Sequence, residues 1–152
     1  MKKIFILLIT NLILVILQNS FFVEFFGTAN NPNLVIALTF MFIFMNLDDT
    51  ALLNVFIGAI LLDLLSSKVV GISTFFLLLV LYGSILFRKA FFKGAIVQFL
   101  FIFISIFVYK TVSSLSFEYT IQSLLISSMF TFVIAYILFM ILKSFRQKYK
   151  SF

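Results

Sequence analysis

The chain has 152 residues, of which 64% are hydrophobic and only 11% are charged, and its net charge is +6. Soluble domains carry roughly 45–50% apolar and about 25% charged residues, and small domains bury the smallest fraction of their surface. The composition therefore indicates an integral membrane protein with a single transmembrane domain over residues 1–152. There is no Cys and no His, which excludes disulfides and thiolate metal sites and removes the commonest general base.

Six apolar runs predict an all-α bundle. A bilayer core of about 30 Å needs about 20 helical residues; the first, fourth and sixth runs reach that length, whereas the second and third are short. The second and third form either two short spans joined by a tight turn or one broken helix. The runs are Ile4–Phe22, Leu34–Leu47, Ala51–Leu65, Val69–Phe87, Ala95–Tyr109 and Ile121–Leu142.

The positive charges favour six spans. With six spans and a cytoplasmic N-terminus, nine of the eleven Lys and Arg residues lie inside, whereas a single crossing over residues 34–65 would leave four inside and seven outside. The positive-inside rule therefore predicts six transmembrane helices with both termini in the cytoplasm. Positive charges at the ends of apolar runs indicate membrane sidedness and no nucleic-acid partner. The C-terminal charges either anchor this topology or contact anionic membrane lipids; they are Lys143, Arg146, Lys148 and Lys150.

Polar and small side chains form stripes at helical spacing inside the runs. Asn11 and Gln18 share one face of the first run, and Asn54 and Gly58 pair on the third. In lipid such side chains face other helices, either within this chain or in a seam that receives a partner's helix. The longest stripe, on the sixth run, is Ser123, Ser127, Thr131 and Ala135.

Acidic residues near the ends of the runs leave several interpretations open. Asp63 either reaches head-group water or Lys68, or is a buried carboxylate that fixes the following loop by accepting hydrogen bonds from backbone N–H groups. Asp48 and Asp49 either cap the third helix or meet a basic cytoplasmic partner.

Lys110 and Glu118 bracket the loop after the fifth run. They are expected near the outer surface, where they either pair with each other or bind an anionic ligand. Exposed pairs of this kind contribute little to stability.

Three segments together resemble the rod shape-determining protein MreD family: LQNSFF at Leu17–Phe22, PNLV at Pro32–Val35 and GAILLDLLSSKVVGIST at Gly58–Thr74. The similarity of pattern extends over residues 4–90, and beyond residue 95 only hydropathy agrees. The turn at residues 46–50 reads NLDDT, where the family usually has Gly and Arg. The positions that match the family's motifs are Gln18, Pro32, Asn33, Asp63 and Gly71.

This resemblance implies a non-enzymatic scaffold of the bacterial cell-elongation machinery in the cytoplasmic membrane, without cofactor or metal. Its implied partners are the single-span protein MreC, and through it cell-wall synthases and MreB filaments. The family is also similar in fold to the substrate-binding S-components of energy-coupling-factor transporters, so an S-component that captures a vitamin is the alternative. A third hypothesis is a small membrane enzyme that uses Asp63, Lys110 and Glu118. Residues expected to hold the bundle or contact the partner are Gln18, Pro32, Asn33, Asn54, Gly58, Asp63, Gly71 and Ser127.

Overall fold

The computed structural model describes residues 2–65, 71–91, 95–113 and 120–150, and within these ranges the chain is helical and has no strand. The predicted all-α class is therefore confirmed. Six principal helices correspond to the six apolar runs, with a π-helix and a short extra helix after the first. In chain order they are α1 Lys2–Leu17, η1 Gln18–Phe22, α2 Val23–Asn30, α3 Leu34–Phe44, α4 Asp48–Leu65, α5 Ile72–Phe91, α6 Ala95–Ser113 and α7 Ile121–Lys150.

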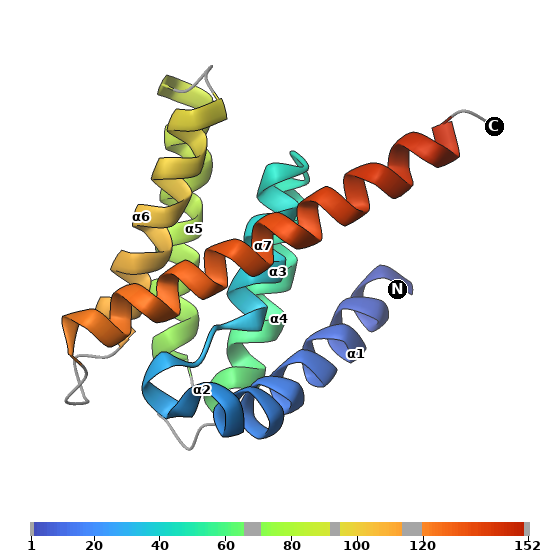
Figure 1. The fold of residues 1–152 in the computed structure, drawn as a ribbon. Helices are drawn as coiled ribbons and strands as arrows, with labels where there is room; N and C mark the ends of the chain where they lie inside the picture. The colour runs from blue at the N-terminus through green and yellow to red at the C-terminus, as the bar shows by residue number, and fades with distance from the viewer. Residues whose placement is uncertain (1, 66–70, 92–94, 114–119, 151–152) are drawn as a thin grey trace.

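Helix α3 lies at the centre of the bundle (Figure 1). It packs against α1, α4 and α7, and the outer helices continue round it through the contacts α4–α5, α5–α6 and α6–α7. Nine of the 11 residues of α3 are buried. Because all sides of α3 face other helices, it lacks the one-sided apolar stripe of a surface helix.

A tight turn joins α3 to α4, as the first of the two interpretations predicted. Asn46 adopts a left-handed conformation with φ 58°. Its N–H donates to Ile43 O, and Leu47 N–H donates to Phe42 O at 2.9 Å. This is the Schellman arrangement, which reverses the chain while satisfying carbonyls at the end of the helix. The second and third runs are therefore two separate helices.

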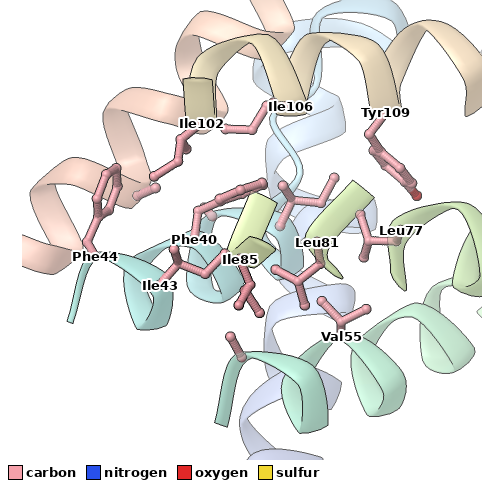
Figure 2. Close-up of a cluster of buried hydrophobic side chains, with 14 of the residues drawn as sticks. Phe40, Ile43, Phe44, Val55, Leu77, Leu81, Ile85, Ile102, Ile106 and Tyr109 are labelled. Atoms are coloured by element: carbon pink, nitrogen blue, oxygen red, sulfur yellow. The ribbon is translucent and has the colours of Figure 1, made fainter. Parts of the chain in front are cut away.

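The apolar core joins α3 to the helices that surround it. Figure 2 shows Phe40 and Ile43 of α3 near Leu81 and Ile85 of α5. On the other side of Phe40, α6 contributes Ile102 and Ile106, and the cluster also contains residues of α4 and α7. Burial of these side chains fixes the positions of helices that are far apart in the sequence.

Only two helical stretches in the described ranges are long and apolar enough to cross a membrane, Lys2–Gly27 and Ile121–Ser144. The fourth run was expected to reach that length as well, but its apolar helical stretch is the shorter Thr74–Leu86. Leu34–Phe44 and Leu100–Thr111 are shorter still. By length and composition, the structure thus supports two candidate spans, where six were predicted.

The segment after the first run contains a helix that the sequence reading did not anticipate. Helix α1 continues through η1, whose wider turns are characteristic of π-helices. Helix α2 follows and is kinked at Gly27, where φ is 69° and ψ is 168°. This backbone conformation favours glycine because it has no Cβ.

Gly58 permits a close approach of three helices. A Cβ at this position would clash with Val35 Cγ1 and would lie 2.6 Å from Asn11 Oδ1. Helices α1, α3 and α4 therefore meet where α4 has no side chain. Gly83 on α5 is different, because a Cβ there would meet no atom within 4 Å.

We expect Gly58→Ala to destabilise the bundle by about 1–3 kcal/mol, the usual range for overpacking. Gly83→Ala is the matched control and should be neutral or slightly stabilising, because alanine favours helix and meets open space. Thermal unfolding of both variants in mild detergent would check this. Equal melting temperatures for the two would show that the close approach at Gly58 is not important for stability.

Candidate functional site

A chain of buried amides links α1, α3 and α4 beside Gly58. Asn11 Nδ2 donates to Asn54 Oδ1 at 2.8 Å, and Asn54 Nδ2 donates to Thr39 Oγ1 at 2.9 Å. All three side chains are at most 1% exposed. In an apolar interior, unpaired amides are costly, so these hydrogen bonds favour one register of the three helices.

Gln18 connects the end of α1 to the start of α3. Its Oε1 accepts a hydrogen bond from Leu34 N–H at 2.9 Å, and its backbone carbonyl accepts one from Asn31 Nδ2 at 3.0 Å. The N–H groups of the first turn of a helix have no partner within the helix. Gln18 therefore satisfies the free N–H of Leu34 and also binds the segment that precedes α3. We call this segment, residues 31–33, the 31–33 linker.

Asn33 caps α3 and binds the linker to α7. Its Oδ1 accepts from Ile36 N–H at 3.0 Å, the usual N-cap hydrogen bond. Its own N–H donates to Thr131 Oγ1 at 3.0 Å. Pro32, the preceding residue, is buried and has no N–H that would need a partner there.

Lys110 is buried, which corrects its expected place near the outer surface. Its ammonium donates to Asn31 O at 2.9 Å and contacts Ser127 Oγ, and Ser127 Oγ donates to the same carbonyl at 2.6 Å. Lys110 thus joins α6 and α7 to the 31–33 linker. No local signal in the sequence places it beside a residue 79 positions earlier. Glu118, its suggested partner, lies outside the described residues.

Asp63 fixes the start of α5. Its Oδ2 accepts from Gly71 N–H at 2.8 Å, from Thr74 N–H at 3.4 Å and from Thr74 Oγ1 at 3.1 Å. Asp63 is 1% exposed, and Gly71 has a left-handed φ of 101°. This confirms the buried carboxylate that accepts backbone hydrogen bonds and excludes the solvent-exposed one. Lys68, named in the other interpretation, lies outside the described residues.

Arg88 closes the opposite end of α3. Its guanidinium donates to Ile43 O at 2.6 Å and to Asp48 Oδ1 at 2.5 Å, and so joins α5 to the α3–α4 turn. Asp48 lies in the first turn of α4, where a carboxylate also complements the helix dipole. The sequence analysis missed this pair, although the predicted topology places both residues at the same end.

The faces of Gly58 and Ser127, considered as seams for a partner's helix, are filled by this chain. Val35 and Asn11 pack against Gly58, and Ser127 binds the 31–33 linker. Thr131 and Ala135, on the same stripe as Ser127, are also buried. The structure therefore assigns both faces to packing within the chain, and the seam interpretation is wrong for this arrangement.

In the described ranges no three His, Cys, Asp or Glu side chains come together in a group that could hold a metal ion. The polar side chains described above are instead engaged with one another in the interior, as in the pair Asn11–Asn54, or with backbone groups at the ends of α3 and at the start of α5. Comparisons of the chain with protein-family models, curated proteins and solved structures find no match.

We expect Asp63→Leu to reduce the yield of folded, monodisperse protein strongly. It would leave Gly71 N–H and Thr74 N–H without their acceptor, at about 1–3 kcal/mol for each buried group. Asp63→Asn retains one acceptor oxygen and should be intermediate, whereas Lys68→Ala should be close to wild type. Size-exclusion profiles of the membrane extracts would rank the three. Equal yields of Asp63→Leu and Lys68→Ala would contradict the role of Asp63.

A double-mutant cycle should detect the pairing of Arg88 with Asp48. The side chains are 11% and 18% exposed, so a coupling of about 1 kcal/mol is expected, at the upper end for surface pairs. Arg88→Lys should also destabilise, since an ammonium cannot reproduce the two directed hydrogen bonds of the guanidinium. Asp49→Ala, at an exposed neighbour, is the control. Additive effects of Arg88→Ala and Asp48→Ala would refute the coupling.

Proposed function

We propose that this chain is a non-catalytic scaffold of the bacterial cytoplasmic membrane that docks a single-span partner of the MreC type in the cell-elongation machinery. One observation carries the proposal. The residues that match the motifs of the MreD family hold the helix ends together: Gln18 binds Leu34 N–H, Asn33 caps α3, and Asp63 binds Gly71 N–H. Three short motifs that are separate in the sequence thus have a shared structural role.

The distribution of side chains supports a membrane environment. Buried positions include Asn11, Asn54 and Asp63, while many of the most exposed side chains are large and apolar, among them Phe25 at 69% and Phe75 at 62%. Soluble monomers rarely expose extended apolar surfaces. A polar interior with an apolar exterior is the arrangement that a hydrocarbon solvent favours.

The positions of the helix ends support six crossings with both termini inside. Figure 1 shows the C-terminus at the upper right, the α3–α4 turn at the top centre and the N-terminus at the right, whereas α2 and the first turn of α7 lie toward the lower left. Arg88 pairs with Asp48 beside the α3–α4 turn, and Lys2, Lys3 and Lys143 lie in the terminal parts of α1 and α7. Helix α3, with 11 residues, crosses only part of the bilayer by itself, and the surrounding helices cover it on all sides.

A scaffold role fits the use of the polar groups. The side chains of Gln18, Asn33, Asp63, Lys110 and Arg88 each bind a backbone atom outside their own element. These contacts stabilise one arrangement of the helices, which is what a docking surface requires. Neighbouring proteins of an elongation complex would bind the rigid exterior of the bundle.

Affinity purification of the tagged protein from its native membrane in mild detergent tests the function. We expect a single-span coiled-coil protein to be retained together with cell-wall synthases. Retention of paired ATPases with a second multispan subunit would contradict the proposal and indicate an S-component. A tagged, unrelated six-span protein expressed at the same level is the control for non-specific retention.

The topology can be tested directly because the sequence has no Cys. Single cysteines introduced at the exposed positions Asn46 and Ser144 should react with a membrane-impermeant maleimide only after the cells are opened. Cysteines at the exposed positions Glu24 and Gln122 should react in intact cells. Labelling of all four positions from one side would contradict the six-span topology.

A further inference from the structure

We propose that the C-terminal part of α7 binds the anionic head groups of phospholipids in the cytoplasmic leaflet. This binding is separate from the docking of a partner, and it rests on the proposed function only for the membrane location and the cytoplasmic C-terminus. The segment concerned is residues 140–150, which we call the α7 extension.

The α7 extension projects beyond the bundle. Phe139 still packs against Phe44 of α3, with ring centroids 5.5 Å apart. The next five residues, from Met140 to Ser144, are all exposed. Five consecutive residues occupy every side of a helix with 3.6 residues per turn, so no helix in the described part of the chain covers α7 here. In Figure 1 the last turns of α7 extend beyond the other helices toward the upper right.

The residues of the α7 extension change from apolar to basic along the chain. Met140, Ile141 and Leu142 are 49%, 48% and 39% exposed, and the candidate membrane span of α7 ends at Ser144. Hydrocarbon favours such apolar side chains, and the head-group region favours the basic residues that follow. A soluble acidic protein would leave the three apolar side chains in water, so the order of residues favours lipid as the occupant. The basic residues are Lys143, Arg146, Lys148 and Lys150.

The positive charges of the α7 extension have no acidic neighbour along the helix. The last acidic residue in the sequence is Glu118, before α7 begins. Asp48, at the start of α4, is paired with Arg88. Lys143 Nζ lies 5.7 Å from the centroid of the Phe139 ring, so its contact is with an aromatic ring. Four cations within eight residues therefore require anions from outside α7.

The helix fixes the depth of these charges relative to the membrane. Helix α7 is continuous from Ile121 to Lys150. At 1.5 Å per residue, residues 143–150 extend only about 12 Å along its axis, which is close to the head-group layer and to one Debye length. A cluster of basic residues directly after a membrane span is the pattern that attracts anionic lipid. Tyr149 also suits this depth, because tyrosine is enriched at the membrane interface.

Brominated lipids can test the inference on the full chain, because the sequence has no Trp. Leu142→Trp places a single fluorophore at the α7 extension, and Ile121→Trp places one at the other end of α7, where the side chain is also exposed. Each variant is reconstituted in nanodiscs of phosphatidylcholine and phosphatidylglycerol, with one of the two lipids brominated. Bromine quenches only a nearby Trp, so the quenching gives the relative affinity of the two lipids at each position.

We expect phosphatidylglycerol to be favoured about fivefold at Leu142→Trp, the effect of one basic side chain on a lipid with one negative charge. No preference is expected at Ile121→Trp. Equal affinities at both positions would overturn the inference and indicate an acidic protein segment as the occupant, which benzoylphenylalanine at Gln147 would capture in native membranes. Quenching by neither lipid at either position would contradict the membrane location itself, and the proposed function would fail as well.

Charge removal distinguishes the α7 extension from other basic residues. Combining Arg146→Gln, Lys148→Gln and Lys150→Gln should lower the preference at Leu142→Trp to about twofold or less, and 1 M salt should do the same because it screens charges beyond about 3 Å. Lys2→Gln with Lys3→Gln, at the exposed start of α1, is the matched control and should retain the preference. An unchanged preference in the triple variant would show that α7 is not the binding segment.

Discussion

The short central helix imposes the main constraint on this structure. At 1.5 Å per residue, the 11 residues of α3 extend only about 16 Å, roughly half of a bilayer core. The start of α3 lies within the bundle, beside the buried Pro32 and Leu34, where its free N–H groups have little access to water. The other end leads from the buried Phe44 into the exposed turn at Asn46 and Leu47. Backbone polar groups in such surroundings must be satisfied by the protein itself. Gln18 and Asn33 do this at the start of α3, and Arg88 does it at the end.

This constraint explains why so many elements meet at the 31–33 linker. A linker that enters the interior brings its own carbonyls with it, and these need donors. Lys110 and Ser127 both donate to Asn31 O, and the Asn31 side chain donates to Gln18 O, so α6, α7 and η1 are attached to the same residue. In the same way, Asp63 accepts hydrogen bonds from Gly71 N–H, just before α5, and from Thr74 N–H in the first turn of α5. The interior polar residues are thus best understood as partners of backbone groups, while many of the exposed side chains are large and apolar.

Small residues and polar residues have complementary roles in the packing. Gly58 allows α1 and α3 to approach α4, and the amides of Asn11 and Asn54 then lie close enough to pair. Apolar contacts alone would tolerate sliding of one helix past another, because many registers bury similar surface. A directed pair of amides favours a single register. A fixed exterior follows from this fixed interior, as the proposed scaffold function would require.

The sequence by itself determined the helical class, because apolar runs favour helix, and its positive charges favoured two separate helices over residues 34–65. The N-cap role of Asn33 and the left-handed conformation of Asn46 follow from local chemistry too, but the sequence analysis did not single them out. It also included the correct interpretation of Asp63, because a carboxylate within an apolar run needs nearby donors. Helix α2, the burial of Lys110 and the pairing of Arg88 with Asp48 were decided by tertiary structure. Each depends on elements far apart in the chain, and no local pattern specifies which helix packs against which.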